Sequence, residues 1–92
     1  MAEVTYEQQF RGTVALTILH LRRLAKSNDT DKGFAAARDL RMIDDEQEAF
    51  MRECIALDEQ MKTGSAEPVP VDAGLIKRLQ ACILSINSAD PA

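Results

Sequence analysis

His20 and the two cysteines are the side chains of this chain best suited to catalysis. A cysteine and a histidine can form a nucleophilic site, in which the imidazole takes the proton of the thiol. His20 is the only histidine, and neither Cys54 nor Cys82 is close to it in sequence. Both cysteines fall at inward-facing positions of a helical pattern, where free cysteine is common. We therefore expect two packed, reduced thiols, a core or boundary histidine, and no enzyme active site.

Metal and cofactor patterns are also incomplete. A carboxylate-bridged metal site in a helical bundle needs Glu-x-x-His pairs on facing helices, and the sequence contains none. The run from Asn28 resembles a calcium loop with Gly33 in sixth place, but Thr30 and Lys32 replace acidic ligands and Asp39 replaces the closing glutamate. The glycines are isolated, so no phosphate-binding loop is predicted. We expect no cofactor and no metal.

Acidic residues are concentrated in the middle of the chain. Residues 44–72 contain nine acids and two bases, in a chain whose net charge is −4. Two of the acids form favourable i,i+4 patterns, Glu48 with Arg52 and Asp58 with Lys62, and acids in a first helical turn suit the helix dipole. Two interpretations stay open: the acids pair with the chain's own bases, or they recognise a basic surface on a partner protein. The nine acids are Asp44, Asp45, Glu46, Glu48, Glu53, Asp58, Glu59, Glu67 and Asp72.

The same acidity disfavours nucleic-acid binding. Residues 34–41, a short turn and residues 46–54 have the layout of a helix-turn-helix, whose second helix would read DNA. That helix would begin with the run 44–48, which offers no basic side chain to phosphates. The pI of about 4.9 and the four aromatic residues also argue against single-strand binding.

Helical periodicity predicts the elements that hold these residues. Thr5 and Gln8 form a capping-box pattern, which predicts a first helix from about Tyr6 to Lys26. The polar cluster at 27–31 ends this helix and caps a short second one, whose apolar positions lie within residues 34–40.

A third helix is predicted to begin near Asp44, where a second capping-box pattern with Gln47 favours a break over one continuous helix. Gly64 ends it, and an extended linker follows at about 64–71. Asp72 caps the last helix, and residues 89–92 form a frayed tail. The expected fold is a single all-α domain over residues 1–92, a small bundle of three longer helices and one short helix.

One face of the first helix is left over when the core is assigned. Leu16 and Leu19 lie opposite the main apolar stripe, beside Gly12 and Ala15. Either the helix is central and packed on both sides, or this face is a surface for self-association or for a partner. The main stripe consists of Phe10, Val14, Ile18, Leu21 and Ala25.

A cytoplasmic location is expected, since there is no basic segment followed by an apolar run and no apolar stretch approaches the ~18 residues of a membrane span. The favoured function is a small cytosolic regulator or inhibitor that binds one protein target with a basic surface. The alternatives are a structural homodimer and a nucleic-acid-binding regulator. The predicted contact residues are Asp45, Glu48 and Glu59 on the acidic helix, and Leu16 and Leu19 on the first helix.

Overall fold

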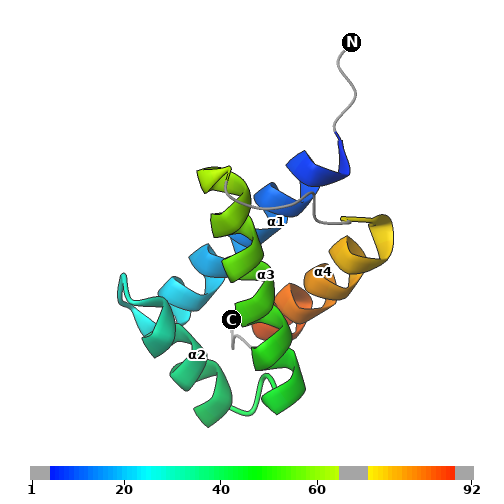
Figure 1. Ribbon diagram of the computed structural model, residues 1–92. Helices are drawn as coiled ribbons and strands as arrows, with labels where there is room; N and C mark the ends of the chain where they lie inside the picture. Colours follow the sequence, from blue (N-terminus) through cyan, green and yellow to red (C-terminus); the bar gives the residue numbers. More distant parts are fainter. Residues whose placement is uncertain (1–4, 65–70, 89–92) are drawn as a thin grey trace.

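The computed structural model describes residues 5–64 and 71–88, and this part of the chain forms four α-helices and no strand (Figure 1). The predicted all-α class, with three longer helices and a short one, is confirmed. The predicted tail at 89–92 and most of the predicted linker lie outside the described residues. The helices are α1 (Tyr6–Ala25), α2 (Thr30–Asp39), α3 (Asp45–Thr63) and α4 (Ala73–Ser88).

Side-chain caps set both ends of α1. The hydroxyl of Thr5 accepts a hydrogen bond from the Gln8 N–H at 3.1 Å, and the Gln8 side chain accepts one from the Thr5 N–H at 3.2 Å. At the other end Lys26 adopts the left-handed conformation with φ of 52°, and its N–H donates to the carbonyls of Arg22 and Arg23. The predicted capping box is confirmed, and α1 ends one residue before the predicted limit.

The break near Asp44 is also confirmed. Its carboxylate accepts a hydrogen bond from the Gln47 N–H at 2.8 Å, and the Gln47 side chain accepts one from the Asp44 N–H at 3.0 Å. This reciprocal cap starts α3. Gly64 ends α3 with φ of 67°, a conformation that costs glycine little. Asp72 starts α4, accepting a hydrogen bond from the Leu75 N–H.

Each of the other helices packs against α1. The core also includes Thr13 and Thr17 of α1, which lie outside the predicted stripe of that helix, and Met51 of α3. The two threonine hydroxyls donate to carbonyls four residues earlier, at 2.7 and 2.9 Å, so burial leaves neither unsatisfied. The buried apolar residues are Phe10, Val14, Leu21, Phe34, Ala37, Ile43, Phe50, Met51, Cys54, Ile76, Leu79, Cys82 and Ile86.

Gly33 allows α2 to approach α1 closely. A Cβ atom at this position would lie 2.6 Å from both the Cβ and the carbonyl oxygen of Leu21. Glycine is therefore required by packing, and its place in a calcium-like pattern is incidental.

Leu40 lies outside the core, although it continues the apolar pattern of residues 34–40. The helix ends at Asp39, and Arg41 adopts a left-handed conformation with φ of 58°. The chain thus leaves the helical path before Leu40 can face α1, and this side chain is 59% exposed.

Candidate functional site

The acids predicted to contact a partner are paired within the molecule. Arg38 on α2 forms ion pairs with Asp45 and, at 3.6 Å, with Glu48. Glu48 also lies 3.1 Å from the Nε atom of Arg52, which confirms the predicted i,i+4 pair. Glu59 lies 3.7 Å from the ammonium group of Lys62. The geometry supports self-pairing for these three acids.

The three acids also do not form one cluster. Asp45 and Glu59 are fourteen residues apart on α3, which separates them by about 21 Å along the helix axis. Asp45 and Glu59 are largely exposed, whereas the side chain of Glu48 is only 25% exposed. A partner would meet them as separate contacts.

Arg52 links α3 to α2. Its guanidinium group lies 2.8 Å from the carboxylate of Asp31 and 4.3 Å from the ring centre of Phe34. The hydrogen bond to Asp31 raises the pKa of Arg52 above its ordinary value, with a further contribution from Glu48. These contacts across 21 residues of sequence hold the acidic helix in place, so part of its charge serves the fold.

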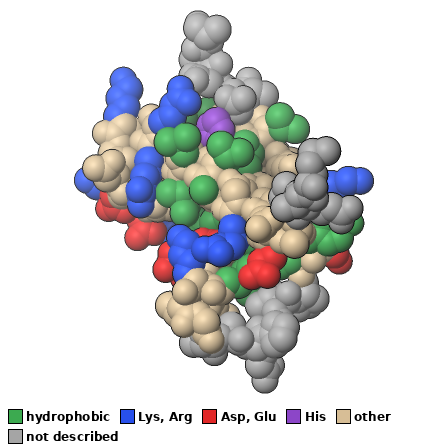
Figure 2. Space-filling view, turned by 90° about the horizontal axis from the view of Figure 1, so that it is seen from above, with side chains coloured by type: hydrophobic (Ala, Val, Ile, Leu, Met, Phe, Trp, Pro, Cys, Tyr) green, Lys and Arg blue, Asp and Glu red, His purple; other side chains and the backbone are tan. Residues whose placement is uncertain are grey.

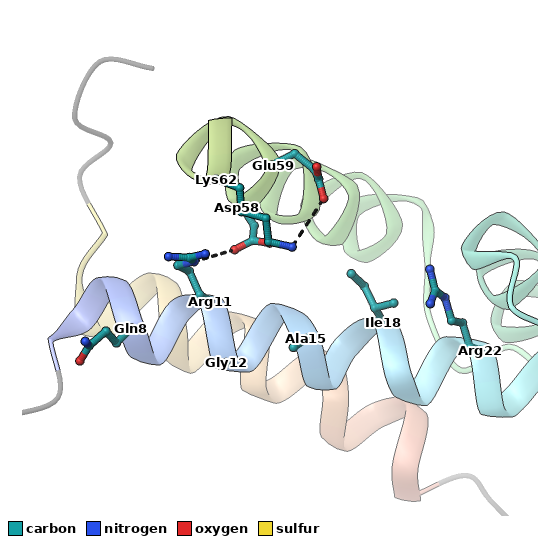
Figure 3. A pocket seen from close by; sticks show the side chains of 9 residues that line it. All are labelled: Gln8, Arg11, Gly12, Ala15, Ile18, Arg22, Asp58, Glu59 and Lys62. Carbon is teal, nitrogen blue, oxygen red and sulfur yellow. Dashed lines mark ion pairs between the residues drawn. The ribbon is translucent and has the colours of Figure 1, made fainter. Parts of the chain in front are cut away.

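A groove of about 640 Å³ lies between α1 and α3. Small residues of α1, Gly12 and Ala15, line it together with Ile18, and charged side chains lie along both edges (Figure 3). The full lining consists of Gln8, Arg11, Gly12, Ala15, Ile18, Arg22, Asp58, Glu59 and Lys62. The groove combines an open, partly apolar centre with polar walls, which is the usual composition of a protein-binding surface.

Asp58 is the buried acid of this groove, with 3% of its surface exposed. One carboxylate oxygen lies 3.3 Å from the Lys62 ammonium group, which confirms the predicted i,i+4 pair. The other oxygen lies 3.6 Å from the Nε atom of Arg11, which is too long for a hydrogen bond, and it has no hydrogen-bond partner among the described residues. Asp58 is thus an ionic link between α3 and α1, a role that spacing within one helix does not predict.

Leu16 and Leu19 form an exposed pair on α1, each 50% exposed. The interpretation that α1 is packed on both sides does not hold for them. They belong to a line of exposed residues whose spacing alternates between four and three, and which we call the outer strip: Gly12, Leu16, Leu19, Arg23 and Lys26. In Figure 2, hydrophobic side chains gather around the single histidine, His20 of α1, with Lys and Arg side chains beside them. The strip thus presents an exposed apolar pair on a face of α1 that lies outside the core.

The residues with catalytic potential lie on three different helices, His20 on α1, Cys54 on α3 and Cys82 on α4. Cys54 and Cys82 are free and buried, as predicted. Burial raises the pKa of Cys54 to about 11 and raises that of Cys82, so both stay protonated at neutral pH. His20 is half-buried on α1. The described residues contain no group of three or more His, Cys, Asp or Glu side chains placed to hold a metal ion.

None of the helices in the described ranges has both the length and the apolar character that a bilayer crossing requires.

Comparisons with known proteins find no matching family model, no matching curated protein and no matching solved structure.

Proposed function

We propose that this chain is a small cytosolic protein-interaction module that regulates or inhibits one protein target, with the outer strip of α1 as its contact surface. The leucine pair carries the proposal, because half of each side chain is exposed. Fully burying one leucine contributes about 2 kcal/mol, so covering the exposed halves of both contributes about 2 kcal/mol, or about thirtyfold in Kd. The buried, reduced cysteines support a reducing compartment.

The groove beside the strip supports the same surface. Gly12 belongs to both features, and a Cβ atom there would meet no other atom within 4 Å. A side chain of the target therefore has room beside α1. The edges carry Arg11 and Lys62, which are half exposed and pair with Asp58, so polar groups border an apolar centre.

A basic partner surface over α3 is a weaker part of the proposal. Asp45, Glu48 and Glu59 would have to share or exchange their internal bases on binding. Glu46 and Glu53 are exposed and form no ion pair within the described part of the chain, so they are the acids of α3 most available to such a surface. Exposed charges of this kind affect association rates more than affinity.

A structural homodimer is the second candidate function. A twofold axis that crosses α1 would bury the leucine pair of one copy against that of the other. Sedimentation of the purified protein decides this directly, because only the homodimer gives a dimer in the absence of other proteins.

The main test is affinity capture from native lysate with three forms of the chain. Leu16→Glu with Leu19→Glu places two charges on the strip, and Ala35→Glu with Leu40→Glu places the same charges at an exposed position of α2 and at its exposed C-cap. We expect the target to be lost only from the first variant, with both variants melting near the wild-type temperature. Equal capture by all three forms would contradict the proposal. A wild-type dimer that only the first variant separates would favour the homodimer.

A further inference from the structure

Charge on α1 is sorted along its length. Its acid, Glu7, lies in the first turn, and the bases Arg11, Arg22 and Arg23 follow, with Lys26 as the C-cap. Two of these bases have partners inside the molecule: Arg11 in the ion pair across the groove, and Arg22 in a hydrogen bond to a threonine of α2. Arg23 and Lys26 are exposed and pair with no acid of the described ranges. Two cations are thus available on the outer strip.

These two cations directly continue the leucine pair. Arg23 lies four residues beyond Leu19 on α1, which places it about 6 Å farther along the helix axis, and Lys26 follows as the left-handed C-cap. The helix dipole favours basic residues in a last turn. It does not explain why Arg23 shares a face with exposed leucines. The strip therefore presents an apolar patch followed, one to two turns later, by positive charge.

We propose that the target of the outer strip is an acidic protein segment, in which carboxylates lie one to two helical turns beyond an apolar patch. Leu16 and Leu19 pack on the apolar patch, and Arg23 and Lys26 pair with the carboxylates. This inference rests on the proposed function and names the chemistry of its target. It differs from the basic partner predicted for α3, because it concerns the opposite sign of charge on another helix.

Charge complementarity favours an acidic protein segment over a second copy of the chain, a bilayer surface or nucleic acid. The strip contains no acid, so a second copy of it would bring no carboxylate to Arg23 or Lys26. Helices that bind a bilayer surface bury a broad apolar face, whereas the exposed apolar part of the strip consists of two leucines, each half covered already. Nucleic acid would pair with the cations but would leave the leucines against phosphates, with no apolar surface to cover them.

The test uses defined probes. The first is a fluorescein-labelled helical peptide of about 15 residues with leucines on one strip and glutamates one to two turns beyond them. A second peptide has glutamine in place of every glutamate. Vesicles of phosphatidylserine and phosphatidylcholine in equal parts, and a duplex DNA oligonucleotide, are the other probes. Fluorescence anisotropy for the peptides and DNA, and co-sedimentation for the vesicles, measure binding.

We expect the glutamate peptide to bind about fivefold tighter than the glutamine peptide, the gain expected from two exposed ion pairs. High salt and the change of Arg23 and Lys26 to glutamine should each remove this preference. Changing Arg41 and Lys77 to glutamine removes the same charge from exposed bases that lie off the strip, and should preserve it.

Equal binding of the two peptides, binding of neither, or tighter binding to vesicles or DNA would overturn the acidic-segment proposal. The proposed function fails separately. If the leucine-pair variant loses its captured target while both peptides bind equally, the interaction surface stands and only the acidic chemistry is wrong. If capture does not depend on the leucines, the proposed function itself is wrong.

Discussion

Replacing Gly33 by alanine tests the close approach of α2 to α1. In an open helix this change would stabilise the protein by about 1 kcal/mol, because alanine has the higher helix propensity. Here the new methyl group would lie 2.6 Å from backbone atoms of Leu21, which cannot rotate away as a flexible side chain can. Ordinary contact begins at 3.4 Å, so the two helices would have to separate locally by 0.8 Å to restore it.

This separation loosens the packing of Phe34 and Ala37, which are buried on the same face of α2. Overpacking of a core costs about 3 kcal/mol at the upper end of its usual range. After the helix-propensity gain, the net loss is about 2 kcal/mol, which lowers Tm by about 8 to 16 °C in a domain of this size.

Gly12→Ala is the matched control. Gly12 is exposed on α1, and its new Cβ would meet no other atom within 4 Å. Only the gain in helix propensity remains, so the free energy of unfolding of this variant should rise by up to about 1 kcal/mol. Thermal and urea unfolding followed by circular dichroism at the helical signal measure both variants. A Gly33→Ala protein as stable as the wild type, or stabilised like Gly12→Ala, would refute the packing of α2 on α1.

Three further predictions concern a buried thiol, a buried acid and a strained turn. The folded-state pKa of Cys54 is about 11, against an ordinary 9.0. The buried thiol therefore contributes fully to stability below pH 9, and the free energy of unfolding should fall by about 2 to 3 kcal/mol as pH rises from 9 through 11. Urea unfolding of wild type and Cys54→Ala at both ends of this range should show the difference between them shrinking, and a constant difference would contradict the burial. Asp58→Ala leaves two half-exposed bases that water solvates, so it should lower the free energy of unfolding by less than about 1 kcal/mol. Arg11→Ala leaves a buried acid short of a partner and should lower it by about 1 to 2 kcal/mol. A lower melting temperature for Asp58→Ala than for Arg11→Ala would oppose this reasoning. Arg41→Gly relieves a left-handed conformation at φ of 58° and should raise stability by about 1 kcal/mol, and a lower Tm would argue against the turn.

Local signals in the sequence predict the elements well. The caps at Thr5 and Asp44 lie within four residues of the groups they bond, so the two helix starts are readable from spacing alone. The end of α2 is harder to predict from the sequence, because the left-handed residue at which the chain turns is an arginine and not a glycine. For that reason Leu40 is predicted in the core but lies outside it.

The candidate site depends on contacts between helices, which spacing does not reveal. The acidic excess is visible in the sequence, but one base that pairs with it is remote, because Arg38 lies on α2 and contacts Asp45 of α3. Arg52 of α3 in turn pairs with an acid of α2, Asp31, across 21 residues. Projection of a single helix relates Asp58 only to residues one turn away on α3. In the structure Asp58 also forms an ion pair with Arg11 on α1, across the groove. The exposure of Leu16 and Leu19 likewise follows from how few helices surround α1, a property of the packing and not of the pattern.

The two faces of α1 differ in how many substitutions the fold tolerates on them. One face holds Phe10, Val14 and Leu21 in the core, so most substitutions there are eliminated through loss of folding. The outer strip contributes little to that core, and changes on it add to the stability of the protein almost independently. If the outer strip binds the target, as proposed, mutations on it can exchange one target for another without passing through unfolded intermediates. A descendant of this chain is free to alter its specificity while its fold persists.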